Sequence, residues 1–357
     1  MRAWDVTAEQ PPPSGAVHAR PTMKDVADRA GVSRQLVSMV LRHKEGASPA
    51  TRDRIMLAAA DLGYHPDLSA RLLSQRRSHQ IGVIYTMHQP FEVDLVECLF
   101  LAASTAGYTL VLVPLSPGRT QASTVAELMQ QRIDALIVLA TDEGLATVPE
   151  LSLHLPTVQL TGPTAHFRAD DVRVDNRQGM RLAVDHVVDL GHTQICHADG
   201  GGGPNSAERR GSYQERMREH GLEQDIDIVT SAYTEEDGAR AAHTLLARGT
   251  LPTAVLCGND RSAFGLIETL IRAGVRIPED ISVVGYDDSN IASLSFLNLT
   301  TIRHDPTRLA ELAVAAVVDR LDNHSHLPPT QTRVEAQLVV RQTTAAPRVN
   351  FRTRDEL

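Results

Sequence analysis

The chain has 357 residues, of which 42% are hydrophobic and 22% charged, and its formal net charge is −9. That length predicts more than one domain, and the composition is ordinary for a globular protein. No apolar run approaches the roughly 18 residues of a membrane-spanning helix, which excludes an integral membrane protein of that type. The three widely spaced cysteines favour a reduced, cytoplasmic protein over a disulfide-stapled one.

Residues 1–20 contain a proline cluster, no helical periodicity and no apolar stretch of the kind found in a signal peptide, so we expect a flexible tail. The charge that follows is uneven. Residues 21–78 hold ten Lys and Arg against six Asp and Glu, whereas the rest of the chain is strongly acidic. A basic segment on an acidic body predicts an anionic partner for that segment alone.

Residues 21–66 contain three short helical patterns. Thr22 is a good N-cap with Asp25 three residues later, as in a capping box, and Gly31 ends this first helix. Ser33 can cap the second helix. A Ser-Pro pair at residues 48–49 begins the third, which stops before residue 63. A helix, a glycine turn and a second helix form the signature of a helix-turn-helix domain.

The second of these helices has two unlike faces when it is projected at about 100° per residue. One face is apolar and is expected to be buried; it consists of Leu36, Val37, Val40 and Leu41. The other face has no acid; it consists of Arg34, Gln35, Ser38, Met39 and Arg42. Guanidinium, amide and hydroxyl groups match the donor and acceptor pattern of a DNA major groove, so we predict that this face reads DNA.

Residues 67–79 read as one short helix followed by a solvated linker, and residues 347–357 as a C-terminal tail. Between them, residues 80–346 alternate apolar strand patterns with helical ones. The predicted strands are 81–85, 109–113, 134–139, 157–160, 194–198, 225–229, 253–257 and 281–285. Continuous apolar strands separated by helices predict two parallel, doubly wound sheets in tandem, an α/β core of two lobes. A ligand is then expected between the lobes, at the carboxyl ends of the strands.

Several ordered motifs carry a family resemblance. They are MKDVADRAGVSRQLVSMVLR, VDNRQGMRLAVDHVVDLGH, AVLCGNDRSAFG, IPEDISVVGYDDS, LTTIRHDP and LVVRQTTAAP. With them, residues 21 to about 346 resemble the LacI/GalR family of bacterial transcription repressors. The resemblance implies a helix-turn-helix head, a hinge helix in the minor groove, and a core like that of periplasmic sugar-binding proteins.

The resemblance also implies which residues contact DNA. Arg34 is expected to donate to a guanine, Gln35 to pair with an adenine, and Leu73 to lever open a base step in the minor groove. Met39 stands where the family often has a polar or basic reader, so apolar contact with a thymine methyl is expected there. The full set is Thr22, Ser33, Arg34, Gln35, Ser38, Met39, Arg42, Ala70 and Leu73.

The effector residues implied by the resemblance are Arg209, Tyr233, Asn259, Asp287, His304 and Phe91. Arginine, amide and carboxylate groups suit vicinal hydroxyls, and an aromatic ring offers a platform for a sugar or base. His304 takes a position often held by Gln, and Thr161 replaces an acid seen in some sugar binders. A sugar is therefore the first hypothesis for the effector, and a purine-like corepressor is the alternative.

The sequence thus predicts a homodimeric, cytoplasmic DNA-binding repressor that needs no metal or cofactor. A transport protein built on the same core is the less favoured hypothesis, because of the DNA-binding head. No set of nucleophile, base and orienting group is recognisable, so an enzyme is not expected. The glycine-rich segment 199–205 follows a strand but lacks the pattern of a phosphate-binding loop, and we expect a turn beside the ligand site.

Overall fold

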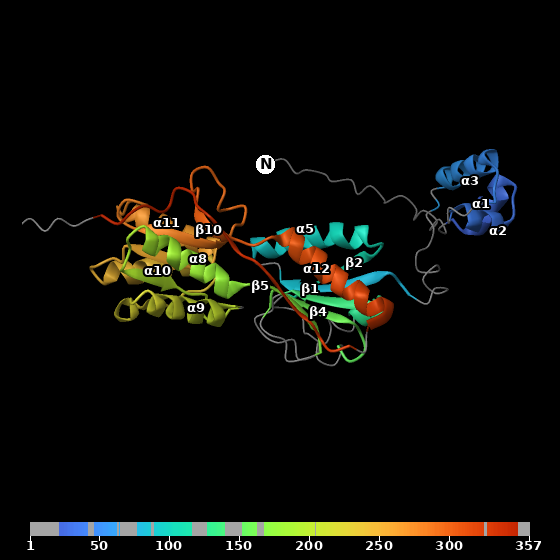
Figure 1. Cartoon of the computed structure of the whole chain (residues 1–357). Helices are drawn as coiled ribbons and strands as arrows, with labels where there is room; N and C mark the ends of the chain where they lie inside the picture. Colours follow the sequence, from blue (N-terminus) through green and yellow to red (C-terminus); the bar gives the residue numbers. More distant parts are fainter. Residues whose placement is uncertain are drawn as a thin grey trace, which may run out of the picture. The chain divides into compact units, whose positions relative to one another are not determined.

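The structure is a computed structural model, and it describes residues 21–41, 46–62, 64, 77–86, 89–115, 127–139, 152–162, 168–203, 205–324 and 327–348. The chain divides into two compact units, Met1–Arg77 and Ser78–Leu357. The first holds the helices α1 to α3, and the second holds both sheets (Figure 1). Among the described residues, no helix is both long enough and apolar enough to cross a bilayer.

The first unit is built from α1 (Met23–Ala30), α2 (Arg34–Leu41) and α3 (Pro49–Asp61). The predicted caps are confirmed. Thr22 and Asp25 form a capping box, Gly31 follows α1 with a φ of 62°, and the Ser33 hydroxyl accepts from Leu36 N at 3.2 Å. Since each helix exposes one face, the helices enclose a small core of Val26, Ala27, Ala30, Val37, Val40, Ile55, Ala58, Ala59 and Tyr64.

The second unit begins with one parallel sheet of six strands in the order β11-β5-β4-β3-β1-β2. Its strands are β1 (Gln80–Thr86), β2 (Thr109–Leu115), β3 (Ala135–Leu139), β4 (Thr157–Leu160), β5 (Asp170–Val174) and β11 (Gln331–Val334). The helices α5 (Pro90–Thr105) and α12 (Pro306–Asp319) pack against each other beside this sheet (Figure 1). We call this part the N-lobe.

The C-lobe is a second sheet of six strands in the order β12-β10-β9-β8-β6-β7. Its strands are β6 (Ile195–Ala198), β7 (Asp227–Val229), β8 (Ala254–Cys257), β9 (Ser282–Asp287), β10 (Thr300–Arg303) and β12 (Gln337–Val339). Its helices are α8 (Asn176–Asp189), α9 (Ser206–Glu219), α10 (Glu235–Ala247) and α11 (Asp260–Arg272), with a 3-10 turn at Glu223–Asp225. The π-helical turn Arg320–His324 follows α12.

The prediction of two parallel sheets is confirmed, with one addition: β12 pairs antiparallel with β10 at the sheet edge. The strands β5, β10 and β11 were not among the predicted ones. The β5 sequence, DDVRV, carries charges on both faces. The structure buries those charges in pairs, Asp171 with Arg173 on one face and Asp170 with Arg320 on the other. The Arg320 guanidinium reaches the Asp170 carboxylate at 2.8 and 2.7 Å. A paired, hydrogen-bonded charge can be buried where a lone one cannot.

The close approach of α10 and α11 yields a test of this packing. A Cβ at Gly238 would overlap the carbonyl oxygen of Ser262, and one at Gly265 would overlap that of Glu235. We expect Gly238→Ala to lower the free energy of unfolding by about 1–3 kcal/mol, because the helices must separate. Gly211→Ala on α9, where nothing lies within 4 Å, is the control. It should raise stability by roughly 0.5–1 kcal/mol. Urea unfolding measures both, and equal effects would contradict this account of the packing.

Candidate functional site

The predicted DNA-reading face is exposed at its N-terminal end, on the first unit. Arg34 and Gln35 are exposed on the first turn of α2, and Ser38 is half-buried one turn later. Val37 and Val40 point the other way, into the small core. The hydroxyl groups of Thr22 and Ser33 lie at the N-termini of α1 and α2, where backbone N–H groups favour an anion. Arg42, Ala70 and Leu73 lie outside the described residues.

Met39 is half-buried rather than free on this face. Its thioether lies 3.3 Å from the place that a Cβ of Gly46 would occupy, and Gly46 has a φ of 122° that favours glycine. The methionine therefore packs against the backbone of Gly46. Apolar contact with a base remains a prediction for Met39, now for a side chain that already has a protein neighbour.

The predicted effector residues gather at the carboxyl ends of the strands. Arg209, on the first turn of α9, is the centre of the cluster and is only 7% exposed. Its Nε donates to the Asn176 side chain at 3.0 Å, and its Nη1 donates to the carbonyl oxygen of Gly258. The guanidinium lies over the Tyr286 ring at 3.7 Å, and its Nη2 is 3.7 Å from Asp287 Oδ1. The free-energy cost of burying this charge is thus offset by hydrogen bonds, by an aromatic ring face and by a carboxylate.

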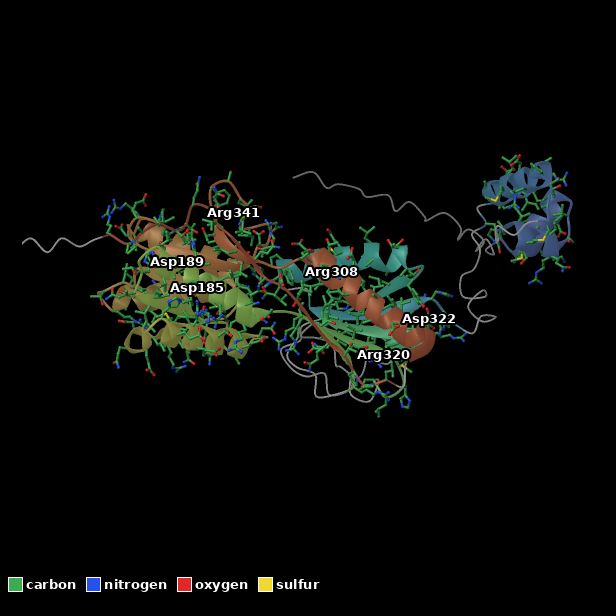
Figure 2. All side chains as sticks on the ribbon, viewed as in Figure 1. Asp185, Asp189, Arg308, Arg320, Asp322 and Arg341 are labelled. Carbon is green, nitrogen blue, oxygen red and sulfur yellow. The ribbon has the colours of Figure 1, made fainter. Side chains whose placement is uncertain are left out.

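Asp287 has a strained backbone that its neighbour helps to hold. Its φ is 109°, and that of Asp288 is 50°, both unusual for residues with a side chain. The Asp288 carboxylate accepts from Arg303 Nε and from Arg341 Nη2, each at 2.6 Å. Arg341, labelled in Figure 2, also donates to the carbonyl of Leu299 at 2.8 Å. Two arginines therefore fix the turn that presents Asp287 to Arg209.

His304 is buried beside the same carboxylate. Its ring contacts the rings of Phe91 and Tyr286, with centroids 5.3 and 4.9 Å away. Its Nε2 is 3.5 Å from Asp287 Oδ1, too far for a good hydrogen bond, and neither ring nitrogen has a hydrogen-bond partner within the described part of the chain. Burial lowers the pKa of His304 below its ordinary value of 6.5, and Asp287 opposes this more weakly.

Asn259 and Tyr233 complete the cluster. Asn259 caps α11 by accepting from Ser262 N at 2.9 Å, and its Nδ2 donates at 3.1 Å to both the Tyr233 carbonyl and the Gln89 side chain. Gln89 caps α5 of the N-lobe, so this bond joins the lobes. The Tyr233 ring fills space that a Cβ at Gly200 or at residue 203 would occupy. The glycine-rich segment therefore accommodates an aromatic ring, which supports the predicted turn beside the site.

All six predicted effector residues thus lie in one connected cluster. Sequence reasoning missed Asn176, Tyr286 and the carbonyl of Gly258, which orient Arg209. Asn176 and Tyr286 stand in the motifs VDNRQG and VVGYDD, so their position was visible, but nothing in one sequence indicates which group a side chain orients. Nowhere in the described part of the chain do three or more His, Cys, Asp or Glu side chains come together as a metal site would require.

Comparison with known proteins identifies the family. A family model described as "Bacterial regulatory proteins, lacI family" matches residues 22–67, and one described as "Periplasmic binding protein-like domain" matches residues 184–344. The chain is 31% identical over 312 residues to the HTH-type transcriptional repressor PurR of Photobacterium profundum, covering 85% of this chain and 93% of that protein. It is 32% identical over 306 residues to the Ribose operon repressor of Escherichia coli K12, covering 84% and 93%.

Solved structures agree. The Lac repressor dimer bound to operator and the anti-inducer ONPF has a TM-score of 0.81 at 27% identity, covering 92% of this chain and all of that one. A LacI transcriptional regulator from a Rhodococcus species has a TM-score of 0.71 at 37% identity, covering 75% of this chain and all of that one. The chain belongs to the LacI family of bacterial regulatory proteins. It is a DNA-binding transcription repressor controlled by a small-molecule effector.

The burial of His304 predicts how the stability of the protein depends on pH. Since its pKa in the folded state lies below the ordinary 6.5, the unfolded chain binds the proton better. The contribution of this pKa difference to the free energy of unfolding is complete above pH 6.5 and is lost as the pH falls below that value. We expect His304→Gln to remove part of the loss of stability between pH 7 and 5, measured by urea unfolding. His243→Gln, an exposed change on α10, should keep the wild-type slope. Parallel slopes for wild type and His304→Gln would contradict the prediction.

Proposed function

We propose that this repressor acts in the cytoplasm as a homodimer that reads two half-sites and binds a sugar at the Arg209 cluster. The observation that carries the proposal is the cluster itself, in which a buried guanidinium, a carboxylate, an amide and two aromatic rings meet at the carboxyl ends of the strands. Because the relatives are repressors, we propose no enzymatic activity for this chain.

In the DNA-binding unit, we assign base reading to Arg34 and Gln35. Both are exposed at the N-terminus of α2, the end of a recognition helix that meets the base edges. Thr22, Ser33 and Ser38 carry hydroxyl groups suited to phosphates. Arg42, Met39, Ala70 and Leu73 keep the roles that the family resemblance implies.

The first experiment tests Arg34 on DNA. A fragment from upstream of the gene's own cluster should bind more tightly than random DNA of equal length, in a gel shift at one stated salt concentration. If Arg34 reads a guanine, Arg34→Ala should weaken binding to that fragment by about 1–3 kcal/mol, and binding to random DNA much less.

Arg54→Ala removes the same charge from an exposed position on α3 and is the matched control. It should weaken binding to both DNAs alike, because the attraction between basic side chains and phosphates does not depend on the DNA sequence. An equal loss on both DNAs for Arg34→Ala would make Arg34 a phosphate contact. Wild-type protein that prefers no fragment would remove the basis of the proposal.

The chemistry of the cluster favours an uncharged ligand with several hydroxyl groups. Arg209 and Asp287 nearly neutralise each other, and the end of the guanidinium that carries Nη1 and Nη2 still has N–H groups beyond those donated to Asn176 and Gly258. Tyr233 offers a ring face 6.0 Å from the guanidinium. A purine is the second candidate, because His304 and Phe91 add ring surface and PurR is among the relatives.

Calorimetry with D-ribose and with hypoxanthine separates these ligand classes. We expect D-ribose to bind wild type, and Arg209→Ala to weaken it by roughly 1.5–3 kcal/mol, the worth of hydrogen bonds to a charged group. Arg218→Ala on the same helix, where the side chain is half exposed, should bind like wild type. Binding of hypoxanthine alone would favour the purine alternative. Undiminished affinity in Arg209→Ala would exclude the arginine from the site.

Exposed apolar side chains support the proposed dimer. Phe100 and Leu101 on α5 are 46% and 68% exposed, and Phe296 in the C-lobe is 74% exposed. Large apolar groups left exposed to water favour association, and the similar Lac repressor structure is described as a dimer.

A charge at Phe296 tests the dimer. We expect Phe296→Lys to raise the dimer dissociation constant by tenfold or more, since burial of a Phe side chain is worth about 1.5–3 kcal/mol. Sedimentation equilibrium measures it. Leu153→Lys, at a side chain 69% exposed in the N-lobe, is the control and should leave the dimer intact. A wild-type monomer at micromolar concentration would refute the dimer.

A further inference from the structure

The point where the chain enters the second unit is held by one carboxylate. That unit begins at Ser78. The backbone N–H of Ser78 donates to Asp134 Oδ1 at 2.9 Å, and the N–H of the next residue, His79, donates to Asp134 Oδ2 at 2.7 Å. Two successive amides thus share one carboxylate, one on each oxygen. Hydrogen bonds to an ionised acceptor are stronger than neutral ones.

The surrounding backbone fixes this contact from several sides. Asp134 N donates to the Gln80 carbonyl at 2.8 Å, and Thr109 N donates to the His79 carbonyl at 2.9 Å. His79 has a left-handed φ of 57°, and its ring lies against that of Tyr108 at 5.3 Å. A non-glycine residue adopts such a φ only where its surroundings hold it. The chain therefore enters β1 in one defined conformation.

The strand β1 links this contact to the effector cluster. Asp134 directly precedes β3, and His79 directly precedes β1, which pairs with both β3 and β2. At the other end of β1 lie Gln89, which accepts from Asn259, and Phe91, which contacts His304. Seven residues of strand span about 23 Å at roughly 3.3 Å each. One strand, paired on both sides, therefore runs from the linker toward the effector cluster.

We propose that Asp134 is the positioning residue that couples the N-lobe to the linker, so that displacement of β1 and β3 is passed to the DNA-reading unit. This proposal rests on the proposed function. The carboxylate holds the first two amides of the unit, which is the point where the linker enters it. The contact joins the start of the unit directly to Asp134, the residue that precedes β3.

The experiment uses the full-length protein without effector, because coupling is reciprocal: if an effector changes the affinity for DNA, bound DNA changes the affinity for the effector by the same factor. Amide hydrogen exchange is measured with and without the upstream DNA fragment in wild type, Asp134→Ala and Asp134→Asn. Asp189→Asn, labelled in Figure 2 at the end of α8, removes the same charge from an exposed site and is the control. Thermal melting verifies that each variant is folded.

Without DNA, Asp134→Ala should speed exchange at Ser78 and His79 at least tenfold, and Asp134→Asn by less, because one acceptor oxygen remains. With DNA, wild type and Asp189→Asn should show changed exchange in β1 and β3. In Asp134→Ala, protection of α2 by DNA should persist, while the change in β1 and β3 falls by more than half. Unchanged exchange at Ser78 and His79, or an undiminished response of β1 and β3, would overturn the proposal. If wild type binds no DNA, the proposed function fails. The exchange measured without DNA then still decides whether Asp134 holds the amides of Ser78 and His79.

Discussion

The buried guanidinium of Arg209 is the interaction around which the effector cluster is organised. A charge with so little exposure is tolerated only when hydrogen bonds and an opposite charge replace water. Its partners come from separate elements: Asn176 from the start of α8, Gly258 from the end of β8, and Tyr286 and Asp287 from the end of β9. Removing any of them leaves part of the guanidinium unpaired. The cluster therefore depends on the correct register of the C-lobe sheet.

The same place in the fold is where the chain passes between the lobes. The chain leaves the N-lobe after β5, at Asp175, returns after β10, at His304 and Asp305, and leaves again after β11, before β12. Asn176 and His304 therefore belong to crossing segments as well as to the cluster. A change in the cluster therefore acts directly on segments that cross between the lobes.

The sequence predicted much of the fold because its strands are continuous apolar runs. The stretch 157–160 was predicted with the bounds that β4 has, and the helix caps at Thr22, Ser33 and Ser48 are present as expected. The failures have a physical cause. The strand β5 was missed because ion pairs from distant residues, such as Arg320, make its charges compatible with burial. The six residues predicted to bind the effector do lie together in the fold. The orientation of Arg209 by Asn176 could not be predicted, because it depends on a contact between residues far apart in the sequence.

Control by an effector requires that the ligand bind one arrangement of the lobes better than another. Hydrogen bonds between the lobes can produce such a difference in affinity, because a ligand that binds their donors competes with them. The Nδ2 of Asn259 donates both its hydrogens, one of them to Gln89 of the N-lobe, and Asn205 donates to the Thr161 carbonyl of the N-lobe at 2.8 Å. A ligand oxygen that accepts from Asn259 must displace either the Tyr233 carbonyl or Gln89, and displacement of Gln89 breaks a bond between the lobes. Gln89 follows β1 by three residues and caps α5, so the exchange of this hydrogen bond takes place just after the strand that begins at the linker.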